Sequence, residues 1–112
     1  MKAILPALKE KKRYLVFKVR SAKEIGMKPA LDAIMSSVKD FLGQLSMARA
    51  GIIMLTGKWD NPTQTGIIKV GHKFVNDLRT ALAFVKTISG QQVIIQTIAV
   101  SGILKKADKG RC

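Results

Sequence analysis

Acidic residues are scarce in this sequence of 112 residues. It contains 7 Asp and Glu against 20 Lys and Arg, which gives a formal net charge of +13 at pH 7. A charge this far from zero repels itself in the folded state and attracts polyanions. The composition therefore favours nucleic acid as the partner, with an anionic membrane surface as the second candidate.

Metal-binding and nucleophilic residues are also few. The sequence has one histidine, His72, and one cysteine, Cys112, which is its last residue. One cysteine cannot form an internal disulfide, and one histidine cannot provide a pair of zinc ligands. Asp32 and Asp40 lie eight positions apart on one predicted helix, too far to share a metal ion. We therefore expect no catalytic residue and no metal or cofactor bound by the polypeptide.

Long hydrophobic runs are missing too. No apolar run reaches the roughly 18 residues that a membrane span requires, and the apolar stretch near the N-terminus is too short for a signal peptide. We expect a soluble cytoplasmic protein that does not bind membranes. Its length fits one domain over residues 1–112, with residues 1–8 and 105–112 expected to be flexible ends.

The hydrophobic pattern alternates between the periods of strands and helices. Strands are predicted at 13–20, 50–56, 67–70 and 93–100, and helices at 29–45 and 74–88. The order β-α-β-β-α-β favours an α+β fold, a ferredoxin-like or RRM-like sandwich. In this fold a four-stranded antiparallel sheet has the spatial strand order 4-1-3-2 and carries both helices on one face.

This topology brings basic residues together at one edge of the sheet. The start of the first strand lies beside the start of the second and the ends of the third and fourth. The basic residues at these positions, named here the basic rim, are Lys9, Lys11, Lys12, Arg13, Arg49, His72, Lys73, Lys105 and Lys106. A solvated run of charge is the ordinary explanation of such residues. Their convergence from several segments instead favours a site for the phosphates of RNA.

The second face of the predicted sheet is apolar as well, so it needs a cover. The cover is expected to be a short N-terminal helix, another subunit or a second copy of the chain. We predict a protein interface that contains Ile52, Met54, Ile67, Ile94 and Ile98, with an intramolecular lid as the alternative.

Aromatic residues that could stack on RNA bases are missing from the predicted sheet. An RRM carries such residues on its first and third strands. The predicted third strand has none, and Tyr14 and Phe17 on the first strand face opposite sides. Trp59 lies in the loop before the third strand, where we expect it to pack against the sheet edge.

Four stretches of the sequence together resemble one known family. They are "PALKEKKRYLVFKV" at 6–19, "AGIIML" at 50–55, "GIIKVGHKFVNDLRTALAFVKTI" at 66–88 and "TIAVSGILKKA" at 97–107. In this order they resemble archaeal ribonuclease P protein component 2, which is related to the eukaryotic Pop-type subunit.

The resemblance implies a non-catalytic, RNA-binding subunit of ribonuclease P, the ribonucleoprotein that removes 5′ leaders from precursor tRNA. It implies that the ribonuclease P RNA carries the chemistry and uses Mg²⁺, which the RNA binds. A TIM-barrel-like protein subunit is the implied protein partner, and self-association through the present subunit is implied as well.

Two other functions stay open at this stage. The chain could be a ferredoxin-like protein-interaction module whose basic charge is incidental. It could also be an enzyme on the same scaffold, such as an acylphosphatase. That enzyme needs an anion-binding loop with an arginine and an asparagine, which "SAKEIGMK" at 21–28 does not contain.

Overall fold

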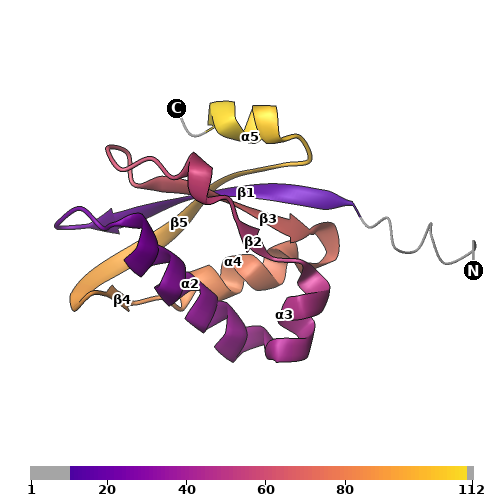
Figure 1. Cartoon of the computed structure of the whole chain (residues 1–112), viewed down its shortest axis with the longest axis horizontal. Coiled ribbons are helices and arrows are strands. Elements are labelled where there is room, and N and C mark those ends of the chain that lie inside the picture. Colours follow the sequence, from indigo (N-terminus) through magenta and orange to yellow (C-terminus); the bar gives the residue numbers. More distant parts are fainter. Residues whose placement is uncertain (1–10, 111–112) are drawn as a thin grey trace, which may run out of the picture.

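Residues 11–110 are described by the computed structural model, and they form one antiparallel sheet with helices on both faces (Figure 1). The strands are β1 (Lys12–Ser21), β2 (Ile53–Met54), β3 (Thr65–Gly71), β4 (Thr87–Ile88) and β5 (Gln91–Ser101). The helices are α2 (Met27–Leu42), α3 (Gln44–Ala50), α4 (Val75–Ala83) and α5 (Leu104–Gly110), with short 3₁₀ turns η1 (Thr56–Lys58) and η2 (His72–Phe74).

The strand order is β2-β3-β1-β5-β4, and all the pairings are antiparallel. The four predicted strands are present in the predicted order, but the prediction of four strands is wrong because β4 adds a fifth. Ser89 and Gly90 join β4 to β5 with φ angles of 52° and 81°. Positive φ at both positions is typical of a two-residue hairpin turn. This turn sends residues 87–88 back along β5, where the apolar spacing had predicted the end of a helix.

The predicted helix over 29–45 is two helices, α2 and α3, which meet at Gly43. Gly43 has φ 82° and ψ 160°, a backbone conformation that few residues other than glycine adopt. Its N–H still donates to the carbonyl oxygen of Lys39 at 2.8 Å, which closes the last turn of α2. Because α3 takes up residues 44–50, the strand predicted at 50–56 is reduced to Ile53 and Met54.

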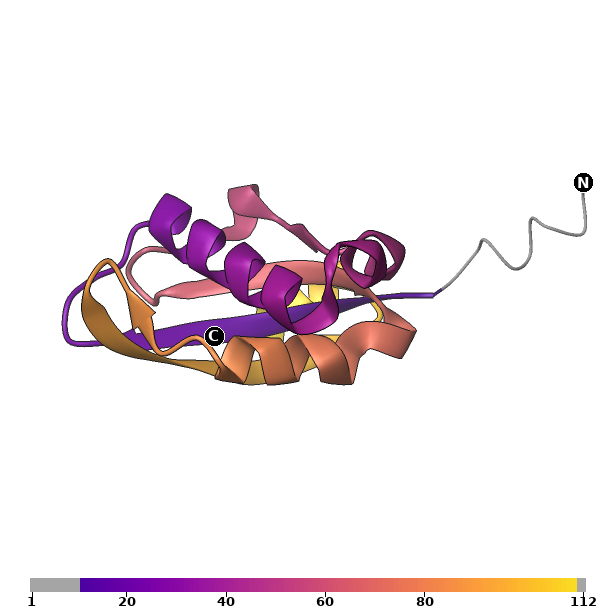
Figure 2. The ribbon, with the colours of Figure 1, turned by 90° about the horizontal axis from the view of Figure 1, so that it is seen from below.

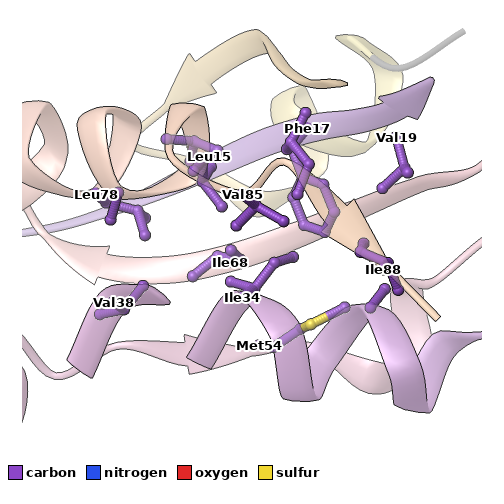
Figure 3. Close-up of a cluster of buried hydrophobic side chains, with 14 of the residues drawn as sticks. Leu15, Phe17, Val19, Ile34, Val38, Met54, Ile68, Leu78, Val85 and Ile88 are labelled. Atoms are coloured by element: carbon purple, nitrogen blue, oxygen red, sulfur yellow. The ribbon is translucent and has the colours of Figure 1, made fainter. Parts of the chain in front are cut away.

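The main core lies between the sheet and the layer formed by α2 and α4 (Figures 2 and 3). Ala30, Ile34 and Val38 recur every four residues along α2, so all three face the sheet and are fully buried. The Ser37 hydroxyl donates to the carbonyl oxygen of Ala81 at 2.7 Å and fixes α2 against α4. Both predicted helices therefore lie on one face, as expected.

The opposite face of the sheet is covered in part by α5 (Figure 1). Ala107 is fully buried in a second apolar cluster with Val16 and Ile67. Residues 105–110, part of the end expected to be flexible, belong to α5, which Ala107 anchors to the sheet. The partial cover of this face is thus intramolecular, as in the alternative considered, but it comes from the C-terminal part of the chain instead of an N-terminal helix. The expectation for residues 1–8 falls outside the described residues.

One close approach within the core depends on glycine. A Cβ atom added to Gly66 would lie 2.7 Å from Phe17 Cζ and 3.0 Å from Trp59 Cε3. The Phe17 and Trp59 rings pack with their centroids 6.1 Å apart, so neither ring can retreat without disturbing the other. The aromatic pair therefore requires the absence of a side chain at position 66.

We expect Gly66→Ala to destabilise the protein by about 1–3 kcal/mol, because the added methyl group overpacks this site. Gly57→Ala is the matched control, since a Cβ atom at Gly57 meets no atom within 4 Å. The control should leave the stability unchanged or raise it by up to about 1 kcal/mol. Urea unfolding followed by circular dichroism measures both. Equal stability of the two variants would contradict the packing argument.

Candidate nucleic-acid interface

The start of β1 lies at the end of the sheet where β3 and β5 finish. Lys12 pairs with Gly71 of β3, and Tyr14 pairs with Ser101 of β5. The C-terminal end of α3 and the first residues of α5 reach the same end, on the right in Figure 1. The topology therefore gathers the described residues of the basic rim at one pole of the molecule. Lys9 falls outside the described residues.

Hydrogen bonds to one backbone carbonyl join the rim segments of β1 and β3. The backbone N–H of His72 donates to the carbonyl oxygen of Lys11 at 2.9 Å, and His72 Nδ1 lies 3.3 Å from the same oxygen. Lys73 follows in η2, and all three side chains are exposed. Lys11, His72 and Lys73 therefore form one side of the rim although 61 positions separate Lys11 from His72.

Lys12 connects the rim to α3. Its Nζ atom lies 3.1 Å from the position that a Cβ atom would occupy on Gly51, the left-handed residue that ends α3. A cation is stabilised near the C-terminal end of a helix, where the backbone carbonyls carry partial negative charge. Arg49, in the last turn of the same helix, is exposed. The helix end that carries Arg49 therefore lies beside the start of β1.

Arg13 connects the rim to the turn between β5 and α5. Its Nη1 atom lies 3.0 Å from the position of a Cβ atom on Gly102, so glycine leaves room for the guanidinium. Ser101 Oγ accepts a hydrogen bond from the Ile103 N–H at 3.1 Å and shapes the turn into α5.

The first turn of α5 adds the last two rim cations. Leu104 and Ala107, three positions apart, share one side of the helix and pack onto the sheet. Lys105 and Lys106 lie between them in sequence and are exposed to solvent. The apolar contacts of α5 therefore decide which way its two lysines face.

Few acidic side chains neutralise the cations of the rim. Among the side chains described between residues 11 and 107, no carboxylate forms an ion pair with a rim cation, and Arg13 is half-buried while the other described rim cations are exposed. Unscreened like charges raise the free energy of the folded state, and a bound anion lowers it. The geometry therefore offers several mobile ammonium groups and one positioned guanidinium to an extended anion such as a phosphate backbone.

Comparison with known proteins places this geometry in a family. Residues 13–110 match the Rpp14/Pop5 family of ribonuclease P proteins. The chain belongs to this family. The family resemblance predicted from the sequence is thereby confirmed.

Curated archaeal relatives agree with this assignment. The chain is 36% identical to "Ribonuclease P protein component 2" of Pyrococcus furiosus over 105 residues, which cover 94% of this chain and 86% of that one. It is 33% identical to the protein of the same name from Methanosarcina acetivorans, over 96% of this chain and 78% of that one. A chain in the cryo-EM structure of yeast ribonuclease MRP has a similar fold, with a TM-score of 0.63 at 13% identity over 85% of this chain and 76% of that chain.

The residues predicted to form a protein interface in this Rpp14/Pop5 member do not share one surface: some are buried and others are exposed. Met54 is buried in the main core, Ile67 is buried beneath α5, and Ile52 is half-buried against the core. The prediction is therefore wrong for Met54 and Ile67, because two helix layers cover them. Ile94 and Ile98 are exposed by 67% and 41% of their surface and remain available to a partner.

The two exposed isoleucines belong to an apolar edge that the sequence analysis missed in part. β4 pairs only with Gln91 and Gln92, so within the described residues the rest of β5 has no strand on that side. Val100 and Ile103 are also exposed, but Val100 pairs with Leu15 and lies on the α2–α4 face, whereas Ile94 pairs with Arg20 on the opposite face. The alternating pattern of β5 had predicted that the isoleucines are exposed on one face. The absence of a neighbouring strand depends on the tertiary structure, so the local pattern could not predict it.

Tyr14 and Phe17 face opposite sides of the sheet and Trp59 packs against Phe17, as predicted. Phe17 is fully buried in the main core, and Tyr14 packs on the other face of the sheet with the cluster beneath α5. Trp59 is half-buried, and its Nε1–H donates to Asn61 Oδ1 at 2.6 Å. The sheet therefore does not present these three rings to bases.

In the part of the chain that the structure describes, His, Cys, Asp and Glu residues form no group of three or more that could hold a metal ion. No helix among residues 11–110 is long and apolar enough to cross a membrane.

Proposed function

We propose that this protein is a non-catalytic RNA-binding subunit of ribonuclease P, a cytoplasmic ribonucleoprotein that removes 5′ leaders from precursor tRNA. The observation that carries the proposal is the basic rim, where cations from β1, α3, η2 and α5 meet without carboxylate partners among the described residues. Relatives at 32–36% identity carry the name of a ribonuclease P protein component.

The rim acts by neutralising phosphates. Two RNA segments that approach each other repel, and a row of ammonium groups between them lowers that repulsion. The described rim residues that carry a full positive charge and contact the RNA backbone are Lys11, Lys12, Arg13, Arg49, Lys73, Lys105 and Lys106. His72 orients the Lys11 segment and lies within reach of the same phosphates. The RNA carries the chemistry with its own Mg²⁺, and the polypeptide contributes no ligand to that ion.

Neutralising the rim should weaken the salt dependence of RNA binding. Each lost phosphate contact lowers the slope of log affinity against log salt by roughly 0.7–0.9, so Lys11→Gln/Lys12→Gln/Arg13→Gln should lower it by roughly 2–3. The control Lys28→Gln/Lys39→Gln/Arg79→Gln removes the same charge from exposed positions on α2 and α4 and should change the slope much less. Fluorescence anisotropy with labelled ribonuclease P RNA measures both slopes.

The same experiment tests the rival function of a protein-interaction module. In that case RNA binding by the wild-type protein vanishes at physiological salt, and the two triple variants behave alike. Either result would contradict the proposal that the rim binds RNA.

The rim should also replace part of the Mg²⁺ that the RNA needs to fold. Adding the wild-type protein with its partner subunit to ribonuclease P RNA should lower the Mg²⁺ concentration at half-maximal leader cleavage. The Lys11→Gln/Lys12→Gln/Arg13→Gln variant should lower it less, because it screens fewer phosphates. A cleavage assay over a Mg²⁺ titration checks this. An unchanged midpoint with wild-type protein would contradict the role.

We further propose that the exposed edge of β5 binds protein, namely the TIM-barrel-like subunit of ribonuclease P or a second copy of this chain. An open strand edge offers backbone N–H and C=O groups for pairing, and exposed isoleucines beside it add apolar area. We interpret the scaffold as a ferredoxin-like or RRM-like core to which β4 and α5 have been added.

Ile94→Asp/Ile98→Asp should weaken association with the protein partner at least tenfold, or about 1.4 kcal/mol, because it places charge on this apolar edge. Ile53→Asp on the other edge of the sheet, where Ile53 is 54% exposed, is the control. Titration calorimetry with the TIM-barrel-like subunit and light scattering of the protein alone separate the two partners. If the control weakens association as much as the double variant, the interface lies elsewhere.

A further inference from the structure

A second group of cations lies at the opposite end of the sheet from the basic rim. It consists of Lys18 and Arg20 near the end of β1, Lys23 in the following loop, and Lys86 just before β4, and is named here the distal cluster. Lys18, Arg20 and Lys23 line one surface cleft, and Arg20 and Lys86 line the neighbouring one. Arg20 therefore joins the four residues into a continuous surface.

Hydrogen bonds to three glutamine side chains fix Arg20 and the loop that carries Lys23. Arg20 Nε–H donates to Gln96 Oε1 at 2.8 Å, which leaves the outer edge of the guanidinium for another acceptor. The Lys23 N–H donates to Gln91 Oε1 at 3.1 Å. The loop after Lys23 is fixed by Gln64, whose side chain accepts from the Ile25 N–H at 2.7 Å and donates to the Ile25 carbonyl oxygen at 2.9 Å. A pre-organised surface loses less entropy when it binds a ligand.

The cleft beside Arg20 combines charge with apolar surface. It is an open cleft of about 490 Å³ between Arg20 and Lys86, with Ala22 and Val93 among its lining residues, and it meets the proposed protein-binding edge of β5 at Ile94. Cations above an apolar wall suit a phosphate and the attached sugar and base of an unpaired nucleotide. Glu24 is the acid that lines the adjacent cleft, and no ion pair between it and Arg20 or Lys23 is found within residues 11–110.

The distance between the two basic regions makes them separate sites. Arg20 follows Lys12 by eight residues along β1, which at about 3.3 Å per residue corresponds to roughly 26 Å. This is about three times the screening length of roughly 8 Å at physiological ionic strength. Phosphates bound at the rim therefore neither neutralise the distal cluster nor require it. The two ends are seen on the right and left of Figure 1.

We propose that the distal cluster is a second RNA-binding site, which takes an unpaired segment of the same RNA that the rim binds. This inference rests on the proposed function, because it assumes that RNA binds at the rim. β1 then acts as a rigid spacer that holds two RNA segments at a fixed separation. Binding at one end raises the effective concentration of the second segment at the other end.

Hydroxyl-radical footprinting of ribonuclease P RNA tests the proposal. Wild-type full-length protein should protect two separate RNA segments. Arg20→Gln/Lys23→Gln/Lys86→Gln should lose one protection and keep the other, whereas Lys11→Gln/Lys12→Gln/Arg13→Gln should show the reverse. Because the two sites are far apart, the losses of affinity should multiply when the two sets are combined.

Two further variants distinguish the loss of a binding site from misfolding and from a non-specific effect of charge. Lys23→Gln/Lys86→Gln leaves the Arg20–Gln96 hydrogen bond intact and should lose part of the same protection. The control Lys28→Gln/Lys39→Gln/Arg79→Gln should keep both protections. The melting temperature of each variant shows whether it is folded.

The outcomes separate this inference from the proposed function. If wild-type protein protects only one RNA segment, and only the rim variant loses that protection, the distal site is overturned and the function of the rim stands. No protection by wild-type protein would overturn both. Weaker binding of the distal variant to the TIM-barrel-like subunit, with an unchanged RNA footprint, would make the distal cluster a protein contact and overturn the inference.

Discussion

Burial of β1 on both of its faces is the constraint on which the rest of the structure depends. Leu15, Val16 and Phe17 are consecutive and fully buried, although neighbouring side chains of a strand point to opposite faces. Each such residue contributes about 1.5–3 kcal/mol when it is removed from water, so neither face can be left open without loss. The α2–α4 layer covers one face and α5 covers part of the other.

Covering both faces also determines where the charge goes. To reach Val16, the chain must turn back at the end of β5, and this turn places Lys105 and Lys106 beside the start of β1. α5 covers the part of the outer face that holds Tyr14 and Val16, while Lys18 and Arg20 follow at alternate positions of the same strand beyond it. One strand thus carries basic residues at both ends and apolar residues in the middle.

The sequence predicted the elements whose pattern is long. The order of the four main strands, the buried positions Ile34 and Val38 of α2, and the convergence of the rim follow from periodicity and connection rules. Short elements were missed. β4 has two residues, too few for an alternating pattern. Among its described side chains, α5 turns Leu104 and Ala107 toward the sheet, from a segment rich in lysine. Such elements are stable because of their neighbours rather than their own propensity.

The sequence by itself determined the net charge, the family and the edge of the sheet at which the rim cations meet. These depend on composition and on strand order, which local pattern and chain connectivity constrain strongly. Only the tertiary structure decided that Met54 and Ile67 are covered, that the edge of β5 is open, and that Arg20 and Lys86 share a cleft. Those features depend on which surfaces touch after the chain has folded, and contacts between distant residues leave little trace in the local order of residues.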